Sequence, residues 1–148
     1  MLGASAAQSG ASAHEMRAAA VVGLLGGMAP DLDVLIRSSR DPLLFLEYHR
    51  QFTHALAFIP IGSLLVALVL YALFARRWLS FRRTWLFAAL GYATHGVLDA
   101  CTSYGTLLLW PFSDRGWIYP MVPWGDPGAT VVMVAGMLAM ARSPSRRR

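Results

Sequence analysis

The sequence predicts an all-α integral membrane protein, a bundle of about four transmembrane helices with both termini on the cytoplasmic side. Hydrophobic residues make up 56% of the 148 residues and charged residues only 14%, whereas a soluble domain carries about 25% charged residues. All thirteen basic residues are arginines. They cluster beside long apolar segments, which suits membrane flanks better than a nucleic-acid-binding surface. We therefore expect membrane lipid, and no nucleic acid, as a partner.

The chain is long enough for one domain. Residues 1–16 form a small, polar stretch that lacks the charged start and apolar core of a signal peptide. Residues 17–141 make up the predicted membrane-embedded domain, and residues 142–148 are a basic tail. Membrane insertion is therefore expected to come from internal segments.

Four segments are candidate spans. In residues 53–75 the only acidic or basic residue is His54, and arginines follow the segment. Residues 84–110 are interrupted only by His95 and Asp99. Both exceed the roughly 20 residues that a helix needs to cross the hydrocarbon core. Two weaker candidates flank them. Residues 18–36 contain a proline and two aspartates, and residues 128–141 are short for a full crossing.

The arginines predict the orientation of these spans. Four arginines lie in the short loop Arg76 to Arg83, which should therefore face the cytoplasm. If all four segments cross, nine arginines lie inside and four outside. This is a multi-pass topology with both the N-terminus and the C-terminus inside.

The same topology gathers most of the acidic and imidazole side chains at the outer membrane face. They belong to the end of the first predicted helix, the start of the second, the outer half of the third and the start of the fourth. These residues are Asp31, Asp33, His49, His54, His95, Asp99 and Asp126. Charged groups in a membrane cost roughly 2.5–3.5 kcal/mol on insertion scales, so they persist where they pair or perform chemistry.

The spacing of these residues refines the prediction. His95 and Asp99 are four apart and share one helical face. Asp31 and Asp33 are two apart and suit a turn, because Pro30 should break the preceding helix. Imidazoles and carboxylates match Zn²⁺ best, with Mn²⁺ or Fe²⁺ as alternatives, and one or two metals could be held. The alternative is a purely structural role, in which these groups only pair with arginines or make hydrogen bonds between helices.

The segments "APDLDVLI", "FLEYHRQFTHA" and "YATHGVLDACTSYGTLLLWPFSDR" resemble, in this order and spacing, the YdjM-like family of predicted inner-membrane metal-dependent hydrolases. The resemblance covers roughly residues 20–130. It implies metal or catalytic roles for the first six residues of the outer group, with Asp126 as a less certain addition. It also implies that Tyr104 and Gly105 shape the site.

The sequence departs from the family pattern at its start and around His54. Family members typically begin with a Thr-His or Thr-Gln pair just before a Leu-Gly pair, whereas Leu2 and Gly3 follow Met1 directly here. Either the start codon is assigned too late or the site is incomplete. In addition, Gln51 and Ala55 replace the usual glycine and serine around the second histidine.

The sequence thus predicts a membrane-bound hydrolase whose metal-activated water attacks a phosphoester or ester, with a lipid-like substrate. We expect His49, His54, His95 and Asp99 to be the primary ligands. Asp31 or Asp33 would be a further ligand or the general base. Arg50 would hold a phosphate or carboxylate of the substrate. The alternative is a non-enzymatic divalent-metal binder or transporter subunit. The oligomeric state is left open.

Overall fold

The protein is described by a computed structural model, which places residues 1–36, 51–101, 106–113, 115–116 and 135. Every regular element in these residues is helical, so the predicted all-α class is confirmed for them. The α-helices are α1 (Leu2–Ser9), α2 (Met16–Met28), α4 (Ile59–Leu73) and α5 (Phe81–Ala100). Short 3-10 helices are η1 (Pro30–Leu35), η2 (Phe52–His54), η3 (Leu56–Phe58) and η4 (Ala75–Arg77).

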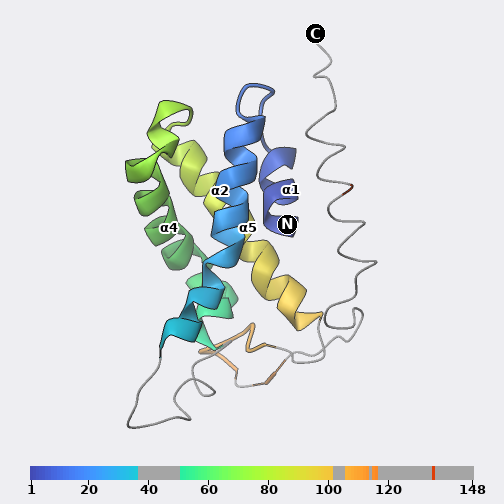
Figure 1. The fold of residues 1–148 in the computed structure, drawn as a ribbon. Helices are drawn as coiled ribbons and strands as arrows, with labels where there is room; N and C mark the ends of the chain where they lie inside the picture. The colour runs from blue at the N-terminus through green and yellow to red at the C-terminus, as the bar shows by residue number, and fades with distance from the viewer. Residues whose placement is uncertain (37–50, 102–105, 114, 117–134, 136–148) are drawn as a thin grey trace.

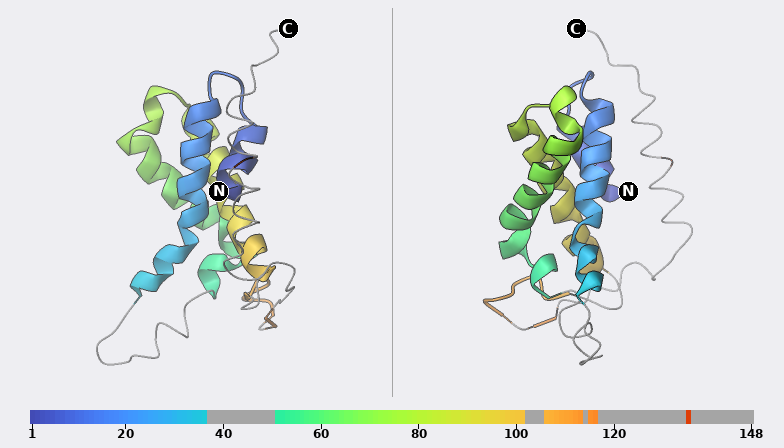
Figure 2. Two further views of the ribbon diagram at one scale, coloured as in Figure 1. Left: turned by 45° about the vertical axis from the view of Figure 1, so that its right-hand side comes forward. Right: turned by 60° about the vertical axis from the view of Figure 1, so that its left-hand side comes forward.

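The helices form a bundle in which α5 packs against α1, α2 and α4 (Figure 1). Helices α2 and α5 run in one direction, and α1 and α4 run in the other (Figure 2). The loop after α1 and the turn after α4 therefore meet at one end of the bundle. The turns η1 and η2 and the end of α5 meet at the opposite end.

Local sequence explains where the helices begin and end. Helix α2 stops at Met28, and the following Pro30 opens a 3-10 turn instead of another helical turn. The predicted break at Pro30 is therefore confirmed. Helix α5 begins at Phe81, directly after its N-cap Ser80, whose hydroxyl accepts a hydrogen bond from the Arg83 N–H. It ends at Ala100 rather than continuing to 110, yet 20 residues still extend about 30 Å.

The N-terminal stretch contributes a helix that composition did not predict. In α1, Ala4 and Ala7 are buried, because small residues let α1 lie very close to α2 and α5. A Cβ atom at Gly23 would collide with the Gly3 carbonyl, and one at Gly91 would collide with the Gly23 carbonyl. Close helix packing through small residues is typical of membrane proteins.

One helical segment of the described residues, Leu56–Leu73, is long and apolar enough to cross a membrane; α2 is apolar but shorter. Large apolar side chains on the outer face of α4, including Leu65, Leu68 and Val69, are exposed. Such a surface fits contact with lipid chains. The predicted fourth span, residues 128–141, lies outside the described residues apart from Ala135. The number of spans therefore stays a prediction.

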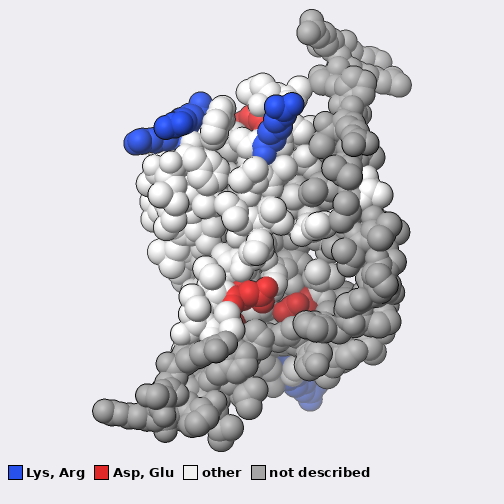
Figure 3. All heavy atoms as spheres, in the orientation of Figure 1, with Lys and Arg blue, Asp and Glu red and all other residues white. Residues whose placement is uncertain are grey.

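Charge is distributed unevenly along the bundle. Figure 3 shows most of the visible basic side chains at the end with the two loops, and acidic side chains toward the opposite end. The loop end carries Arg17 at the start of α2, Arg76 and Arg77 in η4, and Arg82 and Arg83 at the start of α5. The acidic end contains the residues that the sequence predicts to form a metal site.

Candidate metal centre

Four side chains bring one potential ligand atom each to a single point at the acidic end of the bundle. Asp31, His54, His95 and Asp99 place these four atoms within 4.8 Å of one another. They come from three elements, η1, η2 and α5. The convergence that the topology predicts is therefore present for four of the six predicted ligands.

Four of the six distances between these atoms lie between 3.1 and 3.7 Å, and all six lie within 4.8 Å, so the atoms are close enough to share one metal ion. The Nε2 atom of His54 lies 3.2 Å from Asp99 Oδ2 and 3.7 Å from Asp31 Oδ1. The Nε2 atom of His95 lies 3.1 Å from Asp31 Oδ1 and 3.6 Å from Asp99 Oδ2. Ligand atoms around a tetrahedral zinc, with bonds of about 2.0–2.1 Å, lie about 3.3–3.4 Å apart. Two nitrogens and two oxygens are also a donor set that suits zinc.

Burial makes this cluster costly without a cation. The side chain of His54 is 0% exposed, and those of His95 and Asp99 are 14% and 11% exposed. With neutral imidazoles, the Asp99 carboxylate would leave a negative charge in a poorly solvated place, next to the charge of the more exposed Asp31. The buried Nε2 atom of His95 makes no hydrogen bond within the described part of the chain. These residues therefore fit a divalent ion in charge, spacing and donor chemistry.

Helix α5 supplies two of the four ligands because His95 and Asp99 lie one turn apart on the same face. This predicted pairing is confirmed. Asp31 reaches the cluster because the 3-10 turn after Pro30 directs the chain across the end of the bundle. The Asp31 side chain is 53% exposed, so it forms the open side of the cluster.

Helix α5 also supports the backbone that carries His54. The Tyr92 hydroxyl donates a hydrogen bond of 2.8 Å to the Thr53 carbonyl. Gly96 lets the His54 carbonyl approach, since a Cβ at this position would lie 2.7 Å from that oxygen. The Leu56 N–H donates to the Leu108 carbonyl, which ties the same turn to the chain that follows α5. The position of His54 is therefore fixed mainly by α5.

Asp33 lies outside the group of four, against the other side of the His54 ring. Its Oδ2 atom is 3.5 Å from His54 Nδ1 and accepts a 2.8 Å hydrogen bond from the Thr53 hydroxyl. The Asp33 side chain is fully buried. Sequence reasoning did not single out Thr53. Its position directly before His54 is the only sequence signal that could have indicated it.

Several predicted residues lie outside the described part of the chain: His49, Arg50, Asp126, Tyr104 and Gly105. Their roles stay predictions. His14, in the loop between α1 and α2 at the opposite end of the bundle, is exposed.

Comparison with known proteins relates the chain to a family and to two curated proteins. A family model described as "YdjM inner membrane protein" matches residues 1–148. The inner membrane protein YbcI of Escherichia coli (strain K12) is 35% identical over 104 residues, which cover 66% of this chain and 56% of YbcI. The uncharacterized protein YfhP of Bacillus subtilis (strain 168) is 29% identical over 95 residues, 64% of this chain and 28% of YfhP.

This chain thus spans about half of YbcI and about a quarter of YfhP. No solved structure matches it. The match over the whole chain shows that the protein belongs to the YdjM family of inner membrane proteins.

Proposed function

We propose that this protein is a metal-dependent hydrolase in which Asp31, His54, His95 and Asp99 hold a divalent ion, with zinc as the best fit. The observation that carries the proposal is the convergence of two Nε2 atoms and two carboxylate oxygens within 4.8 Å of one another, a donor set that suits zinc. An ion bound there would supply Lewis-acid chemistry, activating water at neutral pH and polarising a phosphoryl or carbonyl oxygen.

The four residues differ in how accessible they are, which suggests different roles. His54 is fully buried and Asp99 nearly so, so both serve to hold the ion. Asp31 is half exposed and lies on the open side, where a substrate and water would arrive. We therefore assign to Asp31 both ligation and acceptance of a proton from the attacking water. The predicted contact of Arg50 with a substrate phosphate remains part of this proposal.

A lipid-like ester or phosphoester is the proposed substrate class. A cavity of about 460 Å³ lies between α2 and α4, lined by apolar side chains that include Met28, Leu32, Leu65 and Val69. Leu32 sits between Asp31 and Asp33 in η1. An acyl or similar chain in this groove would therefore end beside the metal centre.

The proposed orientation places the metal centre at the outer face of the inner membrane. Five of the six arginines that the structure describes lie at the opposite end of the bundle, and basic loops preferentially stay in the cytoplasm. Four spans with both termini inside complete the proposed topology.

Metal analysis of the purified full-length protein tests the centre. We expect about one zinc ion per chain, loss of the ion in His95→Ala and Asp99→Asn, and retention in His14→Ala, which removes an exposed histidine. Full zinc occupancy in the double variant His95→Ala/Asp99→Asn would contradict the assignment. A folded wild-type protein that never retains metal would show that the four residues only form ion pairs.

Turnover separates an enzyme from a metal-binding protein or transporter subunit. We expect the zinc-loaded protein to hydrolyse at least one member of a panel of phospholipids, lipid-linked esters and simple phosphoesters, and Asp31→Asn to lose this activity. Metal binding without turnover across the panel would favour the alternative of a non-enzymatic metal binder.

A further inference from the structure

We propose that Thr53 and Asp33 are positioning residues that hold His54 in the tautomer whose Nε2 lone pair faces the metal centre. This inference rests on the proposed metal centre and assigns Asp33 a role other than ligand. The two ring nitrogens of His54 have different surroundings. Nε2 faces Asp99 and Asp31, whereas Nδ1 lies 3.0 Å from the Thr53 hydroxyl.

The number of hydrogens that Thr53, Asp33 and His54 can donate decides the tautomer of His54. The Thr53 hydroxyl has one hydrogen, and it donates this hydrogen to Asp33 across 2.8 Å. An ionised carboxylate only accepts, so the hydroxyl faces His54 with a lone pair. The Nδ1 atom must then carry the imidazole hydrogen and donate it to Thr53. In the neutral ring, Nε2 is then unprotonated, which is the form that binds a metal.

The surrounding packing holds the hydrogen-bonded chain of His54, Thr53 and Asp33 in place. The side chains of His54 and Asp33 are both 0% exposed. Tyr92 holds the Thr53 carbonyl through its hydroxyl, and its ring packs against Gly62 of α4, where a Cβ would lie 2.6 Å from the ring. The turn that carries Thr53 and His54 is thus held from two helices. A change of tautomer would cost the Thr53 hydroxyl its hydrogen bond with either Asp33 or His54, because it has only one hydrogen to donate.

Metal titration of the metal-free, full-length protein in detergent tests this role, with Co²⁺ as a spectroscopic probe. Outer-shell partners of ligating histidines typically contribute 10–100-fold in affinity. We expect Asp33→Asn and Thr53→Val to bind one Co²⁺ at saturation, with affinity lowered by roughly 10–100-fold. Because Asp33 and Thr53 act through the same hydrogen-bonded chain, the double variant should bind Co²⁺ no more weakly than the weaker-binding single variant. Thr53→Ser, which keeps the hydroxyl, should restore wild-type affinity.

The ¹⁵N chemical shifts of His54 provide a readout that a general loss of stability would not move. We expect the Nδ1–H form in the metal-free wild type and a population of the Nε2–H form in Thr53→Val. Loss of Co²⁺ at saturation in Asp33→Asn, as expected for the ligand variant Asp99→Asn, would show that Asp33 is itself a ligand. Wild-type affinity in Thr53→Val would also overturn the proposal. Retention of metal by Asp99→Asn would instead overturn the metal centre.

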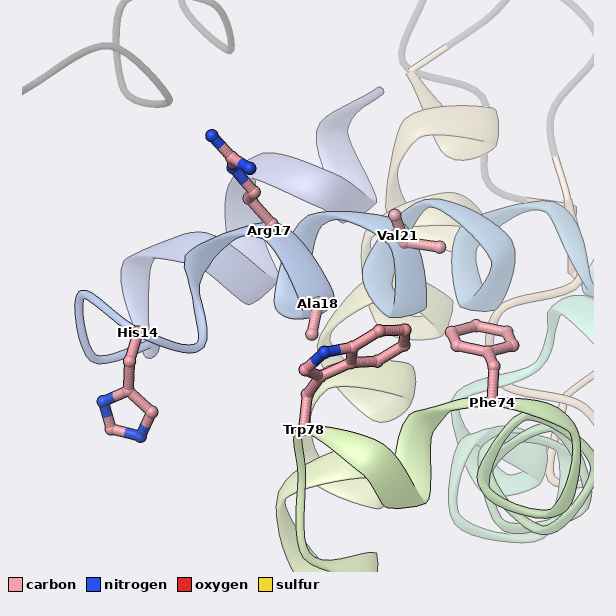
Figure 4. Close-up of a pocket in the computed structure, with 6 residues that line it drawn as sticks. All are labelled: His14, Arg17, Ala18, Val21, Phe74 and Trp78. Atoms are coloured by element: carbon pink, nitrogen blue, oxygen red, sulfur yellow. The ribbon is translucent and has the colours of Figure 1, made fainter.

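A separate cavity at the loop end of the bundle supports a second inference. It measures about 510 Å³ and lies between the start of α2 and the end of α4 (Figure 4). Its lining residues are His14, Arg17, Ala18, Val21, Phe74 and Trp78. The rings of Trp78 and Phe74 lie side by side below α2, the Arg17 side chain extends upward from α2, and His14 extends outward from the loop (Figure 4).

We infer that this cavity binds an anionic phospholipid. Most of its lining is apolar, which suits an acyl chain, Arg17 supplies a cation among the lining residues, and the exposed Trp78 indole is a group typical of the membrane interface. No acidic side chain lines it among the residues that the structure places. The neighbouring Glu15 is already paired with Arg83. Basic pockets at the cytoplasmic ends of membrane helices are suited to anionic headgroups.

Lipid-dependent thermal stability of the detergent-purified protein tests this site. We expect phosphatidylglycerol to stabilise the wild type at roughly 10-fold lower concentration than phosphatidylcholine, a difference of about 1.4 kcal/mol. Arg17→Gln and Trp78→Ala should lose this preference. Arg82→Gln should keep it, because Arg82 is an exposed arginine at the same end that does not line the cavity. Equal loss in Arg82→Gln would show general charge attraction instead. Equal stabilisation by inorganic phosphate would show a phosphate site, and either result would overturn the inference.

Discussion

At the residue scale, the site depends on how closely His54 can approach α5. Its carbonyl fills the space where Gly96 has no side chain, and its two ring nitrogens face two different sets of acidic groups. Metal ligation is sensitive to small shifts in ligand position because bond lengths vary by only about 0.2 Å. A change in the backbone near His54 should therefore alter metal binding without removing a ligand.

Gly96→Ala is expected to weaken metal binding while leaving all four ligands present. The added Cβ would lie 2.7 Å from the His54 carbonyl, so η2 must move away from α5. We expect zinc affinity to fall at least about 10-fold, as for loss of an outer-shell contact, measured by competition with a chelator. Gly116→Ala is the control, since no atom of the residues that the structure places lies within 4 Å of its added Cβ. Unchanged affinity in Gly96→Ala would mean that η2 is not positioned by this contact.

The two aspartates show where sequence reasoning stops at this scale. Their spacing, and Pro30 before them, predicted a turn that points them in different directions, which the structure confirms. Nothing in the spacing could say which of them meets His95. The path of η1 across the end of α5 decides this, because it places Asp31 beside Nε2 of His95 and Asp33 beside Nδ1 of His54.

At the element scale, an ion pair ties the loop between α1 and α2 to the start of α5. The Arg83 guanidinium donates hydrogen bonds of 2.6 and 2.9 Å to the Glu15 carboxylate and a further one to the Gly10 carbonyl. These hydrogen bonds from Arg83 lower the pKa of Glu15 to about 2. The loop end of the bundle is therefore clamped by one arginine.

This pair predicts a specific pH dependence of stability. Because the folded pKa of Glu15 is depressed, its contribution is complete above the unfolded pKa near 4.5 and is lost as the pH falls toward 2. Glu15→Gln should lower the free energy of unfolding at pH 7 by on the order of 1 kcal/mol, because the pair is partly solvated. The melting temperature should fall accordingly. The difference from wild type should shrink between pH 4.5 and 2. Arg82→Gln should match wild type; a constant Glu15→Gln difference across this range would contradict the prediction.

Glycines set the distance between the helices. Gly3, Gly23 and Gly91 bring α1, α2 and α5 together, with backbone atoms in the places that Cβ atoms would take. We expect Gly91→Ala to destabilise the protein by about 1–3 kcal/mol, as overpacking does, measured by thermal unfolding in detergent. Gly10→Ala is the control, because its Cβ would meet only ordinary contacts. Equal stability of both variants would show that the helices can separate at little cost.

At the scale of the whole molecule, the separation of arginines and acids along the bundle predicts its orientation. We expect an introduced cysteine at Gly116 to react with a membrane-impermeant maleimide in intact cells, and one at His14 to react only after the membrane is opened. Both residues are exposed, and they lie toward opposite ends of the bundle. Cys101→Ala provides the background, since Cys101 is the only native cysteine. Reversed labelling would contradict the proposed orientation.

The sequence by itself determined the helical class, the break at Pro30, the pairing of His95 with Asp99 and the family. These features depend on local spacing and composition, which a single chain segment expresses on its own. It did not reveal α1 as a packed helix, because short stretches of small residues give no strong periodic signal. Only the tertiary structure decided that Asp31 faces the cluster, that Thr53 and Asp33 lie behind His54 and that Gly96 sets its position. These contacts join residues 20 or more apart in the chain, and their geometry depends on how α2, η1, η2 and α5 pack against one another.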